Sequence, residues 1–361
     1  MSAAFSAADH VHMARALQLA ARGLFTTSPN PRVGCVIVKD GRVVGEGWHQ
    51  RAGTPHAEIH ALQAAGESAR GATVYVTLEP CSHHGRTPPC AEALVRAGVG
   101  RVVAAMGDPN PLVGGGGIAM LTLAGIEAEV GLMEAEARAL NPGFISRMTR
   151  GRPWVRLKTA STLDGKTALA NGVSQWITGE AARADVQHWR ARACAILTGS
   201  GTLIADNPRM NVRDLDIGRQ PLRVVVDSQL RTPPDAAILP ALVACHMAPA
   251  NARAALERAG AEVVELPGSE DRVDLAALLT LLAQRGVNEL HVEAGAGLNG
   301  ALLAAGLVDE WIAYLAPIAV GDDARGLFAH PPLATLADAA RFRLADLRQI
   351  GGDLRLTLLP A

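Results

Sequence analysis

Three side chains of the kind that hold zinc lie close together in this 361-residue chain, along with a carboxylate that could carry protons. They are His56, Cys81 and Cys90, and Glu58 comes two residues after the histidine. A structural zinc site normally has four protein ligands, whereas a catalytic site has three and leaves the fourth position to water. Because Glu58 is not needed as a ligand, we expect it to take a proton from that water and pass it to a leaving amine. The four residues together predict hydrolytic zinc chemistry.

The spacing of these residues is similar to the signature of zinc-dependent nucleobase deaminases, H-x-E followed by P-C-x-x-C. His56-Ala57-Glu58 and Pro80-Cys81 match it, but eight residues separate Cys81 from Cys90 instead of two. The alternative interpretation, a histidine at a helix start with two core cysteines, leaves Glu58 without a role. We therefore interpret the group as a catalytic zinc site.

Other histidines near this group carry less information. His49 is given no role, and His60, one helical turn beyond the first ligand, is expected in the core or beside the metal ligands. His83, His84 and Arg86 lie between the two cysteines. They either contact substrate or belong to an ordinary loop, and the sequence leaves both alternatives open.

The composition limits the kind of partner. At 361 residues the chain is longer than most single domains, so two domains are expected. The formal net charge is −1 and there is no basic run to hold a nucleic-acid backbone, which disfavours a polynucleotide substrate. No segment approaches the roughly 20 apolar residues of a membrane span, and the cysteines show no disulfide framework. We expect a cytoplasmic protein, a homo-oligomer that binds neither nucleic acid nor membrane.

The first half alternates between helices and strands, which predicts an α/β domain. One helix is expected over residues 55–65, with Thr54 as its cap and Pro55 as its first residue, so that His56 and Glu58 lie in its first turn. The other expected elements are helices over residues 9–22, 89–96 and 132–140, and strands over residues 33–39, 42–47, 73–78 and 99–106. The zinc ligands then lie at or just before helix N-termini, where partial positive charge favours thiolates.

A domain boundary is expected near residue 150, because residues 149–153 have the composition of a linker. The deaminase-like domain is assigned to residues 1–148 and the second domain to residues 149–361. In the second half, strands are expected over residues 154–161, 195–198, 222–227, 241–246, 262–266 and 289–293, and helices over residues 180–192, 250–259 and 275–285. This alternation predicts a mainly parallel sheet covered on both faces, finished by antiparallel strands over residues 311–316, 342–350 and 354–359.

The glycines that follow the strand over residues 289–293 suggest a second chemical site. Gly295, Gly297 and Gly300 form a G-x-G-x-x-G turn before a helix expected over residues 301–305, and such a turn lets the backbone approach a pyrophosphate. A tight turn between a strand and a helix also needs glycines, so the motif alone is ambiguous. Its place after the fifth or sixth strand of the domain favours a nucleotide-binding fold other than the Rossmann fold.

Motifs throughout the chain resemble one family, the bifunctional riboflavin-biosynthesis enzymes that join a pyrimidine deaminase to a pyrimidine reductase. The matching stretches are residues 30–35, 56–58, 77–90, 108–111, 161–166, 174–178, 205–208 and 292–295. They cover both halves nearly end to end, and the long gap between the cysteines is typical of this family. The resemblance implies an α/β fold with a cytidine-deaminase-like N-terminal domain and a dihydrofolate-reductase-like C-terminal domain that uses NADPH.

The resemblance also implies roles for individual residues. It makes His56, Cys81 and Cys90 the zinc ligands and Glu58 the proton carrier. The residues that match the family's cofactor positions are Ala160, Trp176, Thr202, Asp206, Ser228, Gly295, Ala296, Gly297, Leu298, Asn299, Gly300 and Ala301. The residues that match its substrate positions are Ser174, Arg190, Met210, Arg213 and Glu293. The chain departs from the family's pattern at Gly116, where the family commonly has a basic residue. A phosphate contact there must therefore come from the backbone or from elsewhere.

The expected function is therefore a pair of reactions on a phosphorylated pyrimidine. The first is hydrolytic deamination of a diaminopyrimidinone that carries a ribosylamino 5′-phosphate, and the second is reduction of the ribosyl group to a ribityl chain by NADPH. Arg190 and Arg213 suit the phosphate, because a guanidinium can bind two of its oxygens. Ser228 and Arg231 are expected at the 2′-phosphate of NADPH. Asp206 and Lys158 are alternative donors of the proton that accompanies the hydride.

Two functions of other classes remain as alternatives. One is a nucleic-acid cytosine or adenine deaminase in which residues 150–361 form a binding module, which the near-neutral charge disfavours. The other is a zinc-stabilised nucleotide sensor without catalysis, which would make Glu58 dispensable.

Overall fold

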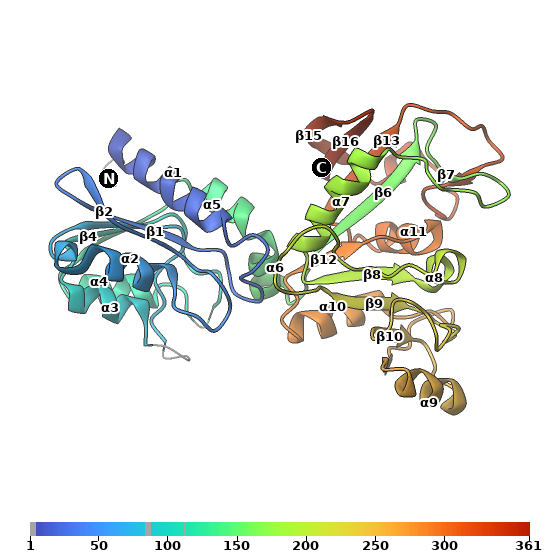
Figure 1. Ribbon diagram of the computed structural model, residues 1–361, viewed down its shortest axis with the longest axis horizontal. Coiled ribbons are helices and arrows are strands. Elements are labelled where there is room, and N and C mark those ends of the chain that lie inside the picture. The colour runs from blue at the N-terminus through green and yellow to red at the C-terminus, as the bar shows by residue number, and fades with distance from the viewer. Residues whose placement is uncertain (1–4, 84–87, 112) are drawn as a thin grey trace. The chain divides into compact units, whose positions relative to one another are not determined.

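The computed structural model describes residues 5–83, 88–111 and 113–361, and it divides the chain into two compact units, Met1–Gly151 and Arg152–Ala361 (Figure 1). The prediction of a linker over residues 149–153 is wrong for its first two residues. Thr149 and Arg150 are the last residues of a helix, α6 (Pro142–Arg150), which the sequence did not predict. The chain leaves this helix at Gly151, whose positive φ of 66° suits a residue without a side chain.

The first unit contains a five-stranded sheet in the order β2-β1-β3-β4-β5. Its strands are β1 (Gly34–Lys39), β2 (Arg42–Trp48), β3 (Thr73–Val76), β4 (Arg101–Ala104) and β5 (Glu127–Val130). The hairpin between β1 and β2 turns at Asp40 and Gly41, which both have positive φ, as a two-residue hairpin turn of type I′ requires. β1 is antiparallel to β2 and β3, whereas β3, β4 and β5 are parallel.

Helices cover both faces of this sheet (Figure 1). On one face lie α1 (Ala7–Ala21) and α5 (Glu134–Leu140), and on the other lie α2 (Ala57–Ala65), α3 (Cys90–Ala97) and α4 (Gly116–Leu123). Two glycines let the helices approach closely. A Cβ added to Gly34 would lie 2.0 Å from the Ala16 carbonyl oxygen of α1, and one added to Gly47 would lie 2.2 Å from the Ala57 carbonyl oxygen of α2.

The helix that carries the first zinc ligand begins later than expected. α2 starts at Ala57, and His56 is its N-cap with an extended backbone, so Thr54 is not the cap and Pro55 is not helical. The reason lies in the preceding turn, where the Thr54 hydroxyl donates to the Arg51 carbonyl oxygen at 2.7 Å. Glu58 is in the first turn of the helix, as predicted.

The second unit is built on a nine-stranded sheet in the order β11-β10-β9-β8-β12-β6-β13-β16-β15. Its strands are β6 (Trp154–Thr162), β8 (Ala195–Gly199), β9 (Leu222–Val226), β10 (Leu242–Cys245), β11 (Glu262–Glu265), β12 (Glu289–Val292), β13 (Glu310–Ala316), β15 (Phe342–Ile350) and β16 (Asp353–Pro360). Neighbours are parallel from β11 to β13, and the last two strands are antiparallel. The predicted, mainly parallel sheet is thus confirmed, as are the antiparallel strands β15 and β16 at its end. β13, also predicted as antiparallel, is parallel to β6 and antiparallel only to β16. A small second sheet pairs β7 (Lys166–Ala168) with β14 (Arg325–Gly326).

The glycine-rich segment of the second unit is helical, which corrects its prediction as a turn. The helices are α7 (Glu180–Arg192), α8 (Ser200–Asp206), α9 (Ala250–Arg258), α10 (Leu275–Gln284) and α11 (Ala296–Ala304). Gly295 is the N-cap of α11, and the glycines that follow lie inside the helix. A Cβ on Gly300 would lie 2.1 Å from the Ala329 carbonyl oxygen, so this glycine admits a neighbouring chain segment.

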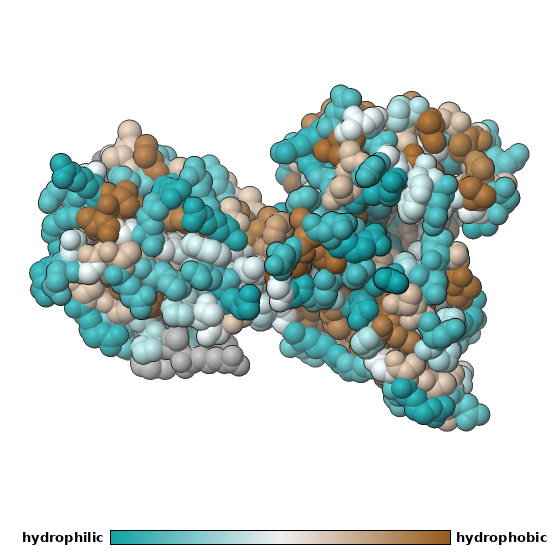
Figure 2. Space-filling view, viewed as in Figure 1, coloured by the Kyte–Doolittle hydropathy of each residue, from teal (hydrophilic) through white to brown (hydrophobic). Residues whose placement is uncertain are grey.

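The visible face of each unit is largely hydrophilic, with hydrophobic residues in small groups (Figure 2). Among the described residues, no helix has both the length and the apolar character that crossing a membrane demands. The apolar residues instead fill separate cores inside the two units.

Candidate active sites

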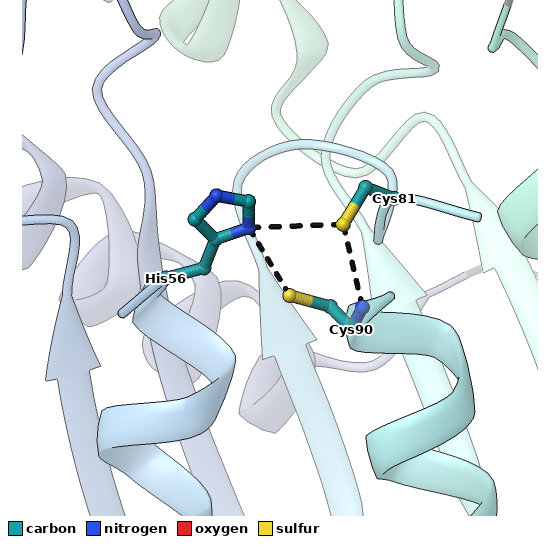
Figure 3. Close-up of side chains that lie close together, drawn as sticks. All are labelled: His56, Cys81 and Cys90. Atoms are coloured by element: carbon teal, nitrogen blue, oxygen red, sulfur yellow. Dashed lines mark hydrogen bonds between the residues drawn. The ribbon is translucent and has the colours of Figure 1, made fainter. Parts of the chain in front are cut away.

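The three predicted zinc ligands converge in the first unit (Figure 3). His56 precedes α2, Cys90 opens α3, and Cys81 lies in the segment that follows β3. The His56 Nδ1 atom lies 3.3 Å from the Cys90 Sγ atom and 3.7 Å from the Cys81 Sγ atom. A nitrogen and a sulfur bound to one tetrahedral zinc would be about 3.5 Å apart. Both nitrogen–sulfur distances therefore fit a shared zinc ion, and all three ligand atoms lie within 4.8 Å of one another.

The electrostatics of the two cysteines favour a metal-binding thiolate. The Cys90 thiol donates to Cys81 and lowers the pKa of Cys81, although burial acts against this shift. His56 and the Cys90 backbone N–H, which lies 3.3 Å from the Cys81 Sγ atom, lower it further. The same interaction with Cys81 raises the pKa of Cys90. One soft thiolate is thus ready for a metal, and a divalent cation would favour loss of the second proton.

Glu58 lies beside the ligands but is not one of them. It is 3% exposed, and burial raises its pKa, with His56 acting in the opposite direction. A carboxyl group with a raised pKa in a dry site can both accept and return a proton near neutral pH. The structure therefore puts the carboxyl group where a proton carrier would act.

His49, which the sequence analysis left without a role, packs against the site. Its ring lies 5.3 Å from the His56 ring, edge to face, and is 2% exposed. Nδ1 lies 3.2 Å from the Pro55 carbonyl oxygen and Nε2 lies 3.1 Å from Asn30 Nδ2. Because a carbonyl only accepts, Nδ1 carries the proton and Nε2 accepts from Asn30. His49 thus connects Asn30 with the turn before the first zinc ligand. Of the inter-cysteine residues, His84 and Arg86 lie outside the described residues.

Glu293 is the centre of a charged cluster in the second unit. Arg190 donates to its carboxylate from Nε at 2.5 Å and from Nη2 at 3.0 Å, and Lys158 Nζ lies at 3.9 Å. Burial would raise the pKa of Glu293, but these two cations hold it well below its usual range. Burial lowers the pKa of Lys158, with Glu293 acting against it. The cluster brings together two predicted substrate residues and one of the two predicted proton donors.

The remaining predicted substrate residues are placed around α7. The Met210 sulfur lies 4.0 Å from Arg190 Nη2, and the Arg213 backbone N–H donates to Gln187 at 3.0 Å. Arg213 is exposed at its side chain, and Ser174 is half-buried in the segment before α7. Arg190 also donates from Nη1 to the Asn211 carbonyl oxygen, at 3.0 Å. Most of its hydrogen-bonding capacity is therefore used inside the protein, which the sequence could not reveal.

The predicted cofactor residues group in part around the start of α11. A Cβ on Gly295 would lie 3.4 Å from the Thr202 hydroxyl of α8, and one on Gly199 would lie 3.5 Å from Leu298. The starts of α8 and α11 thus lie side by side, and nothing crowds the open position at Gly297. This arrangement suits a pyrophosphate, which backbone N–H groups at a helix start can bind.

Other predicted cofactor residues have different surroundings. Asn299 is buried and donates to the Ala294 carbonyl oxygen at 3.0 Å, so its side chain serves the helix start. Trp176 is 68% exposed and stacks on Arg183, whose guanidinium carbon is 4.4 Å from the ring centroid. Ser228 accepts from the Val273 N–H at 3.2 Å. Ala160 lies on β6, Asp206 at the exposed end of α8, and Ala301 inside α11.

Each unit matches a known family model. The model for the cytidine and deoxycytidylate deaminase zinc-binding region matches residues 6–106, and that for the RibD C-terminal domain matches residues 153–356. The zinc-binding site of a deaminase is therefore present in the first unit, with His56, Cys81 and Cys90 as its metal-binding group.

Relatives and solved structures span nearly the whole chain. Riboflavin biosynthesis protein RibD of Escherichia coli is 51% identical over 98% of this chain and 100% of its own length, and that of Haemophilus influenzae is 48% identical over 99% and 98%. RibD of Acinetobacter baumannii has a TM-score of 0.91 at 48% identity, covering 98% of this chain and 99% of that one. A Thermotoga maritima diaminohydroxyphosphoribosylaminopyrimidine deaminase/5-amino-6-(5-phosphoribosylamino)uracil reductase has a TM-score of 0.86 at 31% identity, with coverage of 98% and 99%.

Each half of the molecule thus matches the kind of domain that the resemblance implied. Because relatives of this similarity extend over almost all of its length, the chain belongs to the RibD family of bifunctional deaminase/reductase enzymes of riboflavin biosynthesis.

Proposed function

We propose that the first unit deaminates 2,5-diamino-6-(5-phosphoribosylamino)pyrimidin-4-one and that the second reduces the ribosyl group of the product with NADPH. The convergence of three zinc ligands beside the buried Glu58 carboxyl is the observation that carries this proposal. The name of the Thermotoga maritima relative, which specifies a deaminase and a reductase acting on phosphoribosylated pyrimidines, supports the choice of substrates.

In the deamination, Glu58 moves protons between water and the leaving group. When bound, zinc supplies the Lewis acidity that makes hydroxide available near neutral pH. Glu58 accepts the proton that the water loses, and the hydroxide adds to the amine-bearing ring carbon. Glu58 then returns the proton to the amino group, and the carbon–nitrogen bond breaks to release ammonia. The hydroxyl that remains on the carbon becomes a carbonyl as its proton passes to the neighbouring ring nitrogen. His56, Cys81 and Cys90 would hold the metal; of the three, Cys90 is buried and the other two are half-buried.

In the reduction, the cluster around Glu293 orients the sugar. NADPH supplies the hydride that converts the ribosyl group to ribityl. Lys158 is favoured over Asp206 as the donor of the accompanying proton, because it lies in the buried cluster and burial lowers its pKa. Asp206 is exposed at the end of α8. We assign the phosphate mainly to Arg213, since the guanidinium of Arg190 is already paired with Glu293.

We place the pyrophosphate of NADPH at the start of α11, next to Thr202 and Gly295. The preference for NADPH over NADH is assigned to Ser228 and Arg231, which follow β9. Support comes from Arg231, whose Nη2 atom lies 3.4 Å from the Ser200 hydroxyl at the start of α8. A cation is thereby held near the helix starts, where a 2′-phosphate would need one.

Several finer assignments stay predictions. They are the division into a deaminase and a reductase near residue 150, the homo-oligomeric state, the cytoplasmic location and the individual cofactor and substrate contacts.

A coupled assay tests the proposal. The purified protein should release ammonia from the phosphorylated diaminopyrimidinone and then oxidise NADPH, followed by the fall in its absorbance. Removal of zinc with a chelator should stop ammonia release but leave NADPH oxidation on the pre-deaminated pyrimidine. Ammonia release without any NADPH oxidation would instead favour a deaminase with a binding module.

A further inference from the structure

Glu79, in the segment between β3 and Cys81, is a buried carboxylate whose partners are backbone N–H groups. It is 4% exposed, and no ion pair of this residue occurs among the described residues. Its Oε2 atom accepts from Asp108 N at 3.1 Å and from Gly115 N at 3.0 Å, and its Oε1 atom accepts from Gly117 N at 3.0 Å and from Ile118 N at 3.3 Å. Three of these donors belong to the start of α4, where the helix dipole also favours negative charge.

The same stretch of chain is in close contact with the residues on both sides of the zinc ligand Cys81. A Cβ on Gly117 would lie 1.8 Å from the Pro80 carbonyl oxygen, and one on Gly116 would lie 2.5 Å from the Ser82 hydroxyl. The start of α4 therefore rests directly on the segment that carries the ligand.

Asp108, whose N–H donates to Glu79, also shapes the neighbouring turn. Its carboxyl is half-buried, and burial raises its pKa against the effect of the Asn110 N–H, while the negative charge of Glu79 raises it further. One of its oxygens accepts from Asn110 N at 2.8 Å and so shapes the turn over residues 108–110. Glu79 is thus the link between this turn, the start of α4 and the ligand segment.

We propose that Glu79 is a positioning residue of the deaminase, which holds the turn over residues 108–110 and the start of α4 as one wall of the pyrimidine pocket. It acts through these segments and touches neither zinc nor the reacting atoms. The inference rests on the proposed deaminase function.

The hydrogen bonds explain why a carboxylate is required. Each of its two oxygens accepts from two N–H groups, so a glutamine would turn an NH₂ group towards two donors and repel them. An aspartate keeps four acceptor positions but is shorter by one methylene group. Glutamine therefore tests whether all four acceptor positions are needed, and aspartate tests whether the length of the side chain is needed.

The arrangement also bears on the substrate phosphate. Gly115, Gly117 and Ile118 donate to Glu79, and Gly116 N donates to the Val113 carbonyl oxygen at 3.0 Å. The N–H groups at the start of α4 are therefore engaged, and a phosphate cannot use them. Because Gly116 has no basic side chain, a phosphate contact here would have to come from the backbone or from elsewhere in the chain. The backbone at the start of α4 is excluded.

The test compares full-length, zinc-loaded Glu79→Gln, Glu79→Asp and wild-type enzyme by ammonia release, zinc content and NADPH oxidation on pre-deaminated substrate. For Glu79→Gln we expect KM for the pyrimidine to rise about tenfold or more, because small displacements of a pocket wall are costly. Zinc content and NADPH oxidation should equal those of the wild type. Glu79→Asp should show a smaller rise. Glu129→Gln, which removes a carboxylate paired with Arg101 in the same unit, is the matched control and should leave KM unchanged.

An unchanged KM in Glu79→Gln with full zinc would overturn the inference, and so would loss of zinc in parallel with activity, which would make Glu79 part of the metal site. If Glu79→Gln does not fold, Glu79→Asp decides, and a wild-type KM in that variant contradicts the proposal. Absence of ammonia release by the wild-type enzyme would refute the proposed function itself, so the two failures are distinguishable.

Discussion

The residues of the zinc site differ in how much of their role is visible in the sequence. His56, Glu58, Cys81 and Cys90 were predicted as a group because their types and spacing are local properties of the chain, and the structure brings the three ligands together. Glu79 was missed because the groups that bind its carboxylate follow 29 to 39 residues later. Such partners are known only once the chain is folded.

Replacement of Glu58 by glutamine tests the separation of proton transfer from metal binding. Glu58→Gln should keep its zinc, because the ligands are unchanged, while ammonia release falls by about 10²–10⁴-fold, as is typical when a general acid–base group is lost. Metal analysis and ammonia assays on the same sample measure both effects. Glu67→Gln, an exposed glutamate of the same unit, is the control. Loss of zinc in Glu58→Gln would mean that this residue is a ligand.

At the scale of elements, α2 is positioned by β2, because the residues of β2 that contact the helix are glycines and have no side chains. Gly45 and Gly47 of β2 both face the helix, and a Cβ on Gly45 would lie 2.2 Å from the Ala61 carbonyl oxygen. The helix backbone therefore rests on the strand backbone, and this contact fixes the height of Glu58 above the sheet. Both glycines were visible in the sequence, but which element they admit depends on the fold.

Gly47→Ala should displace α2 and with it the first ligand. The new Cβ would meet backbone atoms, which cannot rotate away, so we expect a loss of about 1–3 kcal/mol in stability and a marked fall in zinc affinity and ammonia release. Zinc titration and the ammonia assay check this. Val43→Ala, at an exposed position of the same strand, should be near wild type. Equal zinc affinity in Gly47→Ala and wild type would show that the contact does not set the site.

The start of α1 is tied to the sheet by Asp9, whose carboxylate accepts from Tyr75 and Arg101 at 2.7 Å each. Although burial acts against it, the hydrogen bond from Arg101 and that from Tyr75 lower the pKa of Asp9. A lowered pKa in the folded state stabilises the protein above the unfolded value, about 3.9, and this contribution is lost as the pH falls below it.

Asp9→Asn should therefore be less stable than wild type by about 2 kcal/mol at pH 7, and the gap should narrow below about pH 4. Calorimetry of the full chain measures this difference in the unfolding transition of the first unit. That transition is identified as the one whose temperature zinc chelation also lowers. A gap that stays constant down to pH 3 would show that the Asp9 charge does not contribute.

Two helices whose starts the sequence missed share a physical cause. α4 begins within a run of four glycines, which have low helix propensity, and its start is held by Glu79 from a distant segment. α11 likewise begins within its glycine motif. The strands of the nine-stranded sheet were predicted almost to the residue, because buried β-branched runs between helices are a strong local signal, whereas the short strands β7 and β14 were not predicted. Local propensity fails where tertiary contacts stabilise an unfavourable segment.

At the scale of the whole molecule, each compact unit contains its own core and its own set of chemical groups. A fragment of residues 1–151 should bind zinc and release ammonia, and a fragment of residues 152–361 should oxidise NADPH with deaminated substrate. A cut after residue 148 should give a less stable first fragment, because it removes Arg150, which donates to Ser146 at 2.6 Å in α6. Fragments that fold by circular dichroism but catalyse neither step would refute independent units.

The two units are joined in one continuous chain at Gly151, and this affects the flux through the two successive reactions. Two separate enzymes can vary in amount, whereas two units of one polypeptide are always made in equal number. The steady-state level of the deaminated intermediate then depends on the ratio of the two turnover numbers and not on the rates of synthesis of two proteins. A substitution that slows the second unit alone raises that level, and no change in expression of the chain restores the ratio.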